Sequence, residues 1–514
     1  MKYFLMLIQL WVGFLPICAS YPKANIWIIP SVESPQVYRN YAQTSKVHLE
    51  MARGEVEHIQ LVFPSKVNEE YRFTFDRNLK GIQISARELK KMNGYYDALV
   101  PFKNQLKCTD TLTAVWITVQ CPSRVPVGKY HQTIKIEGSK HFTIQLDYNV
   151  HHTTIPLKSS IPITVGVENR CVAEGLNDKE ADKERQRWVD FVLSYRMTPV
   201  FGTQITPERW QYEHSFSPWA WNDKRSIRLL NDRRYSCYML PFFTLSENEL
   251  ASLLCNIQKK GKLKESLFYI WDEPAYMEDY EQIKQKVNII RKYASDARIL
   301  TTFFCGPRNG PRKGDLYAVF DYLKHHIHVA TISLAPCKGN EEEVQHIRYK
   351  VPEGIDWWSY VCWQPGGNEP NFLLQMKGIQ QRAIMWRTWN NGSQGFLYWN
   401  CNIYHKRNPF TYITDMPHGD GILIYPGDIL GRKGPIASAR LERWRDGAEE
   451  MELLRLVEKN YSKEKADTLL NIVYSSPLSF IEKAHNIPFF RKELLDQLDK
   501  TIPIDYKLRI TDFI

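Results

Sequence analysis

The chain has 514 residues, enough for two or three domains, and its 43% hydrophobic and 24% charged residues are typical of a soluble globular protein. Its net charge of +10 is modest and no dense run of Lys and Arg occurs, which argues against nucleic-acid binding. Metal-binding Cys and His motifs and phosphate-binding glycine loops are missing from the sequence, so we expect no catalytic metal and no cofactor. The 15 Trp and 28 Tyr favour a carbohydrate partner, because sugars stack on aromatic rings, although a bulky aromatic core explains them equally well.

Residues 1–20 are typical of a signal peptide, with Lys2 before an apolar stretch at 4–15 that is too short to span a membrane comfortably. Acylation of Cys18 as a lipoprotein anchor is the alternative, which the preceding Ile17 disfavours. No later segment is long and apolar enough to cross a bilayer. We therefore predict an exported protein, periplasmic or extracellular.

Residues 21–156 predict an all-β sandwich. Apolar and polar residues alternate along 133–137 and 142–150, with a plausible turn at 138–140 between them, and 116–120 reads as a further strand. No helical pattern of useful length interrupts this region, which favours the sandwich.

Residues 160–437 alternate between strand and helix patterns, which predicts a (β/α)8 TIM-type barrel. A doubly wound sheet is the alternative, but no glycine-rich dinucleotide loop follows the first strand. The clearest strands are expected at 163–167, 199–201, 266–271, 299–304, 328–333, 356–362 and 395–399, and helices at 179–195, 246–259, 279–293 and 341–349.

Residues 438–514 predict a C-terminal helical extension that packs on the barrel. A helix from 438 to about 459 carries an apolar stripe made of Leu441, Trp444, Ala448, Met451 and Leu454. The charged residues that open this helix are expected to tie it to the barrel rather than to contact substrate; they are Arg440, Arg443, Arg445 and Asp446.

The segment Trp271-Asp272-Glu273-Pro274 closes the buried strand 266–271. In a barrel the reacting groups lie at the C-terminal ends of the strands. Two adjacent carboxylates at such a place cost solvation energy unless they are paired or used. We therefore take Asp272 and Glu273 as the candidate catalytic residues, the alternative being a structural pair bonded to a loop and to Arg side chains.

The expected partner carboxylate is missing from the strand counted as the seventh, 356–362. Retaining glycosidases use a second carboxylate about 5 Å from the acid as nucleophile. Here Asp356 begins the strand and Glu369 lies beyond it in a glycine-rich loop. This favours attack by the 2-acetamido group of the substrate itself, with Asp272 stabilising the acetamido N–H and Glu273, its pKa raised, protonating the leaving oxygen.

Aromatic and amide side chains near the strand ends are candidates for sugar binding, with packing in the core as the alternative. On a strand, Trp358 and Tyr360 share one face and Trp357 and Ser359 the other. Tyr360 could donate its phenol to the acetamido carbonyl, and Trp399 could wall the pocket. Asp420 and Tyr425 could reach the rim or form a structural turn. The full set of predicted substrate-binding residues is Trp271, Trp358, Tyr360, Trp363, Trp399 and Asn400.

Five segments follow one another in a distinctive order: Phe268–Pro274, Trp357–Tyr360, Gly395–Trp399, Gly419–Gly427 and Arg440–Leu454. This set resembles the domain-of-unknown-function 4091 proteins, which overlap glycoside hydrolase family 123. The resemblance implies an exo-acting, retaining β-N-acetylgalactosaminidase that acts on glycans with a terminal N-acetylhexosamine by substrate assistance. It assigns Asp272 as the acetamido-stabilising residue and Glu273 as the acid/base.

Two other functions are compatible with the sequence. The first is a glycosidase on another sugar, with Glu273 as general acid and an unrecognised nucleophile. The second is a non-catalytic glycan-binding protein built on a barrel, which the intact Asp272–Glu273 pair disfavours because a lapsed enzyme has no need of both.

Overall fold

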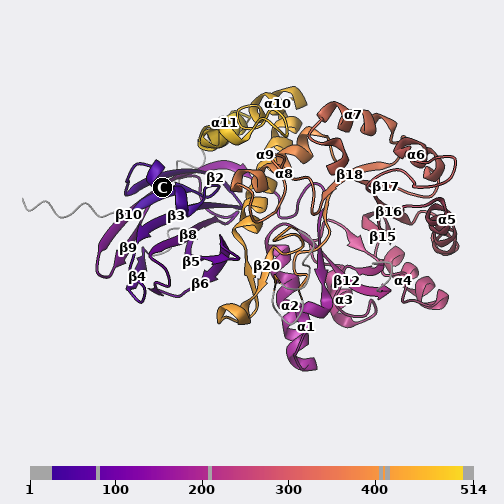
Figure 1. Ribbon diagram of the computed structural model, residues 1–514, viewed down its shortest axis with the longest axis horizontal. Coiled ribbons are helices and arrows are strands. Elements are labelled where there is room, and N and C mark those ends of the chain that lie inside the picture. Colours follow the sequence, from indigo (N-terminus) through magenta and orange to yellow (C-terminus); the bar gives the residue numbers. More distant parts are fainter. Residues whose placement is uncertain (1–25, 77–80, 207–210, 405–408, 411–416, 502–514) are drawn as a thin grey trace, which may run out of the picture.

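The computed structural model describes residues 26–76, 81–206, 211–404, 409–410 and 417–501. The predicted signal peptide, Cys18 included, lies outside these residues. Figure 1 shows a β-rich N-terminal region on one side, a barrel surrounded by helices on the other, and C-terminal helices between and above them. Within the described ranges, no helix is long and apolar enough to span a membrane, and the nine cysteines are all free thiols.

The N-terminal region is made of two five-stranded sheets. The first has the order β1 (Trp27–Pro30), β3 (Glu55–Pro64), β8 (Leu112–Cys121), β5 (Gln83–Met92) and β6 (Tyr95–Pro101). The second has the order β2 (Lys46–Arg53), β10 (His141–Thr154), β9 (Gly128–Glu137), β4 (Glu70–Phe75) and β7 (Gln105–Lys107). The alternation predicted at 133–137 and 142–150 is that of β9 and β10, which pair antiparallel across the turn at 138–140.

The two strands β3 and β8 of the first sheet are buried on both faces. The inner face of this sheet packs against the second sheet through Leu61, Phe63 and Ile117. Its outer face, with Val62 and Trp116, belongs to the core that surrounds the barrel. This second contact explains why β3 is buried at nine consecutive positions instead of alternating.

The barrel is a nearly closed sheet of nine strands in the order β13-β12-β11-β19-β18-β17-β16-β15-β14. The strands are β11 (Ile163–Glu168), β12 (Thr198–Thr206), β13 (Gln211–Ser215), β14 (Tyr238–Met239), β15 (Ser266–Trp271), β16 (Arg298–Phe303), β17 (Val329–Ser333), β18 (Asp356–Val361) and β19 (Phe396–Tyr398). All neighbours run parallel except β13, which is antiparallel to β12, so the sheet is mixed and departs from a regular eight-fold ring. The Phe216 amide, just after β13, donates to the Met239 carbonyl of β14 at 2.7 Å and nearly closes the ring.

Helices surround this sheet, which has one core in the barrel interior and another between its outer face and the helices. They are α1 (Asn169–Ala173), α2 (Asp178–Ser194), α3 (Lys224–Leu229), α4 (Glu247–Lys259), α5 (Met277–Arg291), α6 (Leu316–Leu323), α7 (Glu341–Lys350) and α8 (Gly378–Asn390). The interior core includes Leu267, Leu300 and Trp358, and the outer core lies between strands and helices. The helices predicted from 179, 246, 279 and 341 correspond to α2, α4, α5 and α7.

After β19 the chain forms a short ladder of β20 (Ile424–Pro426) and β21 (Pro435–Ala437), followed by α9 (Ala439–Asn460), α10 (Lys463–Leu470) and α11 (Ile487–Asp499). Short 3₁₀ helices occur at η1 (Pro35–Asn40), η3 (Leu263–Glu265), η4 (Ala335–Cys337), η5 (Gly427–Leu430) and η6 (Ile481–Asn486).

Helix α9 is buried on all sides over its first four turns. The predicted apolar stripe is buried, but so are the charged residues around it, which are Arg440, Glu442, Arg443, Arg445, Asp446, Glu449, Glu450 and Glu452. The helix lies between the β-rich region and α8, so it packs on the sandwich as well as on the barrel (Figure 1).

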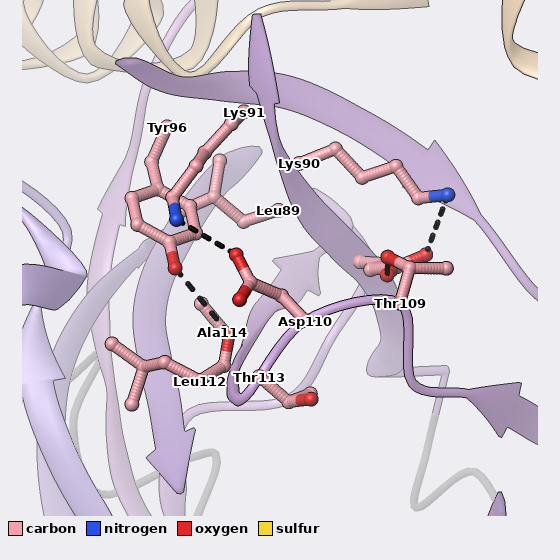
Figure 2. Close-up of a pocket in the computed structure, with 10 residues that line it drawn as sticks. Leu89, Lys90, Lys91, Tyr96, Thr109, Asp110, Leu112, Thr113 and Ala114 are labelled. Carbon is pink, nitrogen blue, oxygen red and sulfur yellow. Dashed lines mark hydrogen bonds and ion pairs between the residues drawn. The ribbon is translucent and has the colours of Figure 1, made fainter. Parts of the chain in front are cut away.

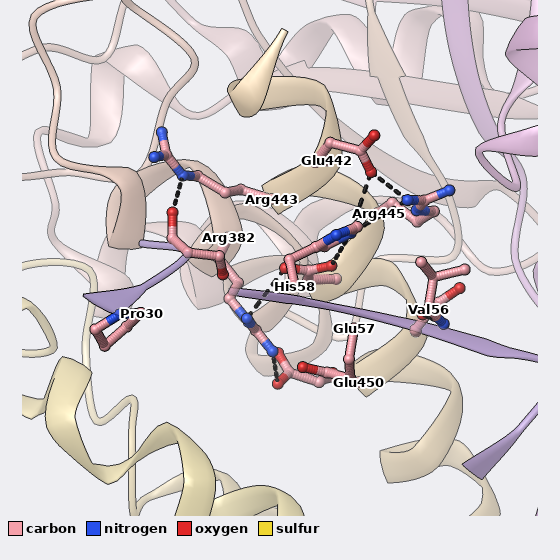
Figure 3. A network of polar contacts seen from close by, with 12 residues as sticks. Pro30, Val56, Glu57, His58, Arg382, Glu442, Arg443, Arg445 and Glu450 are labelled. Atoms are coloured by element: carbon pink, nitrogen blue, oxygen red, sulfur yellow. Dashed lines mark hydrogen bonds and ion pairs between the residues drawn. The ribbon is translucent and has the colours of Figure 1, made fainter. Parts of the chain in front are cut away.

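A network of buried charges joins α9 to β3 and α8 (Figure 3). His58 Nε2 lies 3.1 Å from Glu442 Oε2, while its Nδ1 accepts the Trp116 indole N–H at 3.0 Å. On the α8 side, Arg382 contacts Asp446 at 3.1 Å and Glu450 at 2.5 Å. Burial lowers the pKa of His58 to about 4, so its neutral ring donates through Nε2.

Helix α11 closes the network from the C-terminal side. The Arg491 guanidinium binds Glu55 at 2.7 Å and Glu57 at 2.9 Å, both on β3. Removal of one member of such a network leaves a buried charge without its partner, which costs far more than loss of a surface pair.

We expect Arg382→Met to lower the free energy of unfolding by about 3–5 kcal/mol, because Glu450 and Asp446 lose their buried cation. Urea denaturation followed by circular dichroism measures this loss. The matched control is Lys324→Met at the C-cap of α6, because the 2.8 Å pair between Lys324 and Asp321 is worth under about 1 kcal/mol. Equal losses in the two variants would contradict the proposed importance of the network.

Candidate functional site

Asp272 and Glu273 directly follow β15, which is the fourth parallel strand of the barrel in chain order. Glu273 has a φ of +45°, in the left-handed region that a non-glycine residue seldom adopts. Successive residues of an extended strand point to opposite faces. The left-handed turn between these two residues instead brings both carboxylates to interior tyrosines of the barrel, Tyr269 and Tyr360.

Two hydroxyl groups hold one oxygen of Asp272. Its Oδ1 accepts the phenol of Tyr269 at 2.6 Å and the hydroxyl of Thr302, on the neighbouring strand β16, at 2.8 Å. Asp272 is nevertheless exposed to solvent.

Glu273 accepts a hydrogen bond from the Tyr360 phenol through Oε1. Solvent reaches the residue, yet protein atoms crowd its carboxylate. This loss of hydration, together with the charge of Asp272, raises the pKa of Glu273 to about 7. The Tyr360 hydrogen bond and the charge of Arg308 act in the opposite direction. A carboxyl group with this pKa can both give and take a proton near neutrality.

The strand β18 divides its aromatic residues between the two cores, as predicted. Tyr360 belongs to the interior core and reaches Glu273, whereas Trp357 packs in the outer core. Trp358 also points inward but is only 1% exposed, and Gly395 lies directly against its indole. The structure therefore assigns Trp358 to the core rather than to a sugar-binding surface.

Trp399 is a partly buried wall of the interior core, and Asp420 holds it in place. The Trp399 indole N–H and the Tyr398 hydroxyl both donate to Asp420 Oδ1 at 3.1 Å. Burial raises the pKa of Asp420 to about 6. Tyr425, the other residue of this segment considered for the rim, instead bonds Asp97 of β6 at 2.6 Å and is structural.

The remaining predicted sugar-binding residues have different surroundings. Trp363 follows β18 and is 41% exposed, so it is available at the surface. Asn400 is buried, and its Oδ1 accepts the Asn402 amide at 2.9 Å, as in a turn. Trp271 packs in the outer core with Lys286 Nζ 5.7 Å from its ring.

The position of Trp271 results from a β-bulge. Tyr269 pairs with Leu300, but Trp271 pairs with Thr301, so β15 has one extra residue at this point. The extra residue turns Trp271 to the helix side of the sheet and returns Asp272 to the interior. The prediction that Trp271 contacts substrate assumed a regular strand.

Two hollows elsewhere in the molecule are unrelated to these carboxylates. One, of about 160 Å³, lies on the β-sandwich and is lined by Lys91, Tyr96 and Asp110 (Figure 2). Its polar groups bond one another, with Lys91 Nζ 2.7 Å from Asp110 Oδ2. The other, of about 400 Å³, lies beside residues 156–158 and includes Tyr235 and Tyr238.

Comparison with known families decides the kind of protein. A profile described as glycoside hydrolase 123, catalytic domain, matches residues 183–457, more than half of the chain. The chain belongs to glycoside hydrolase family 123. It is therefore a glycoside hydrolase. No curated protein sequence matches it.

One solved structure has the same overall fold as this family 123 protein. A family 123 glycoside hydrolase from Clostridium perfringens, whose structure was analysed for the details of glycolipid glycan hydrolysis, superposes with a TM-score of 0.62 at 14% identity. The match covers 95% of this chain and 100% of that one. A Bacteroides ovatus GH5 xyloglucanase has a TM-score of only 0.27 at 10% identity, covering 79% of this chain and 98% of that one.

Sequence reasoning missed several residues at the site. His214 on β13 stacks on Tyr269, with ring centroids 4.3 Å apart and planes 10° from parallel, and burial lowers its pKa to about 3. Arg308, in the loop after β16, lies 6.0 Å from the ring of Tyr276, which is 46% exposed. Thr302 could have been found from its place on the strand next to β15; His214 comes from the antiparallel β13, which the barrel pattern does not predict.

The acidic residues around β18 are engaged elsewhere in this glycoside hydrolase. Asp356 begins the strand and pairs with Arg298, at the opposite end from the site. Glu369 is buried and binds Arg387 at 2.8 Å. The strand itself runs out into Cys362 and Trp363, so the place of a seventh-strand nucleophile holds no carboxylate. Among the described residues, no cluster of three or more His, Cys, Asp or Glu is arranged to hold a metal.

We expect Glu369→Gln to keep glycoside hydrolysis within about 3-fold of the native rate while it destabilises the fold by about 1–3 kcal/mol through the Arg387 contact. Initial rates on an aryl glycoside and a thermal unfolding curve measure the two effects. A loss of about 10³-fold or more at unchanged stability would instead make Glu369 the missing nucleophile.

Proposed function

We propose that this family 123 enzyme is an exo-acting, retaining β-N-acetylgalactosaminidase in which the 2-acetamido group of the substrate is the nucleophile. The observation that carries the proposal is the pairing of Asp272 and Glu273 at one opening of the barrel, while Asp356 and Glu369 form ion pairs away from it. Two carboxylates that are adjacent in sequence suit this chemistry, because the protein does not have to supply the attacking atom.

In the first step the acetamido oxygen attacks the anomeric carbon and the bond to the leaving oxygen breaks. Glu273 gives its proton to that oxygen, and the free Oδ2 of Asp272 accepts the acetamido N–H as positive charge develops on the group. In the second step Glu273 takes a proton from water, which opens the cyclic intermediate from the opposite face. Two inversions at the anomeric carbon give overall retention.

The pKa of Glu273, about 7, supports its role as acid and then base. Tyr360 is placed to serve both stages. Its phenol donates to Glu273 in the structure, and it lies on the same interior face where an acetamido carbonyl would be received. Because a phenol has a single proton, substrate binding would transfer this hydrogen bond from Glu273 to the carbonyl.

We infer that the substrate is a glycan with a terminal β-linked N-acetylgalactosamine. Trp399, held by Asp420, would wall the sugar pocket, and the exposed Trp363 and Tyr276 would contact the rest of the glycan. The description of the Clostridium perfringens enzyme suggests the glycan of a glycolipid as one substrate class. Such glycans are met outside the cytoplasm, in line with the export predicted from residues 1–20.

We expect Glu273→Gln to lower kcat/KM about 10²–10⁴-fold on an unactivated β-N-acetylgalactosaminide, and Asp272→Asn to do so comparably, since each removes one of the two roles. Native enzyme should be inhibited by a thiazoline analogue of the cyclic intermediate. It should also be inactive on the matching β-galactoside, which has no acetamido group. Rapid hydrolysis of that β-galactoside would favour a direct displacement by another residue.

The pH profile gives an independent test. The general acid must start protonated, so kcat/KM should fall as the pH rises through about 7. Arg308→Gln removes a cation that lowers the pKa of Glu273, so the alkaline limb should move to higher pH. Asp272→Asn removes the anion that raises this pKa, so in its residual activity the limb should move to lower pH. Shifts of equal sign in the two variants would mean that Glu273 is not the titrating acid.

A further inference from the structure

Thr302 lies at the contact between the two candidate catalytic residues. It is on β16 and only 1% exposed, and the bulge in β15 pairs the preceding residue, Thr301, with Trp271. Its Oγ1 accepts the backbone N–H of Glu273 at 2.9 Å and donates to Asp272 Oδ1 at 2.8 Å. One hydroxyl group therefore contacts both residues of the pair.

Each hydroxyl group has a single proton, so only one arrangement of donors and acceptors satisfies the three hydrogen bonds among Tyr269, Thr302, Asp272 and the Glu273 amide. The Tyr269 phenol has one proton, which is directed to Asp272 Oδ1 at 2.6 Å. The single proton of Thr302 is directed to the same oxygen, so the 3.2 Å contact between the two hydroxyls has no proton of its own. Asp272 Oδ1 thus accepts two hydrogen bonds, and Oδ2 is left for another donor.

We propose that Thr302 and Tyr269 are positioning residues that fix the carboxylate plane of Asp272, so that Oδ2 meets the acetamido N–H, and that Thr302 also holds the left-handed backbone of Glu273. The inference rests on the proposed function, since it concerns the carboxylate to which that function assigns the acetamido group. Neither Thr302 nor Tyr269 has to touch the substrate.

The surroundings of Tyr269 support this role. Its ring is packed within the interior core and stacked against the neutral imidazole of His214, which limits its rotation. The buried hydroxyl of Thr302 is restrained by the strand pairing of β15 with β16. Both donors are therefore rigid, as the positioning of a catalytic carboxylate to within about 0.5 Å requires.

The backbone contact has a separate consequence. A non-glycine residue at positive φ carries a conformational cost of order 1–3 kcal/mol. The hydrogen bond from the Glu273 amide to Thr302 helps to offset that cost. Loss of the Thr302 hydroxyl is thus expected to disturb both carboxylates, whereas loss of the Tyr269 hydroxyl disturbs Asp272 alone.

The test compares Thr302→Val, Thr302→Ser and Tyr269→Phe with Thr301→Val as the matched control. Thr301 is the preceding residue on β16, is equally buried, and its hydroxyl has no hydrogen-bond partner among the described residues. On an unactivated β-N-acetylgalactosaminide we expect Thr302→Val and Tyr269→Phe to lower kcat about 10–100-fold, with a smaller change in KM. Thr302→Ser should stay within about 3-fold and Thr301→Val should be unchanged.

Affinity for the thiazoline inhibitor and a double-mutant cycle distinguish positioning from a general loss of structure. Thiazoline affinity should fall in Thr302→Val roughly in step with kcat. In an Asp272→Asn background, Tyr269→Phe should have little further effect because it acts through Asp272 alone, whereas Thr302→Val should keep the part of its effect that passes through the Glu273 backbone. Full additivity of Tyr269→Phe with Asp272→Asn, or activity of Thr302→Val equal to that of Thr301→Val, would overturn the proposal.

The outcomes also separate this inference from the proposed function. If Asp272→Asn alone retains native activity, the proposed function is wrong and the positioning role falls with it. If Asp272→Asn is inactive while Thr302→Val and Tyr269→Phe are both normal, only the positioning role is wrong. Should Thr302→Val fail to fold, Tyr269→Phe in the two backgrounds supplies the same comparison.

Discussion

The left-handed backbone of Glu273 is the constraint on which the site depends. A strand alone would direct two consecutive carboxylates to opposite faces, and only one of them would reach the barrel interior. The turn requires an acceptor for its amide and a receptor for each side chain. Thr302 supplies the first, and the interior tyrosines Tyr269 and Tyr360 supply the second. Three strands of the barrel, β15 with its bulge, β16 and β18, thus contribute contacts to a single backbone conformation.

The two carboxylates of the site differ from the other acidic groups discussed above in the kind of partner that they contact. Elsewhere in the molecule, acidic groups such as Glu369 and Glu450 are buried against arginines. Asp272 and Glu273 are held mainly by neutral hydroxyl groups, which fix their orientation without cancelling their charge. Burial of the Glu273 carboxyl group and the uncancelled charge of Asp272 then act together to raise the pKa of Glu273.

The sequence predicted the features that depend on the periodicity of apolar residues and on the order of strands along the chain. The end of β15 and the division of Trp357 and Tyr360 between two cores followed from alternation along a strand. What the sequence did not reveal depends on register between distant segments. The bulge that turns Trp271 outward, the antiparallel β13 that contributes His214, and the depth of Trp358 all arise from how strands pair and pack. The charges that open α9 were predicted to tie the helix to the barrel, but their burial was not predicted, since an amphipathic pattern is ordinarily read as one solvated face.

The charges of α9 also bear on how this enzyme can be inherited or recombined. The segment that carries the family signature ends at residue 457, yet Glu450 within it shares a buried network with Arg491 of α11, which in turn binds Glu57 of the β-sandwich. A barrel transferred without the β-sandwich and α11 would leave the charged groups of α9 without their buried partners. Sandwich, barrel and terminal helices are therefore expected to be inherited together as one unit.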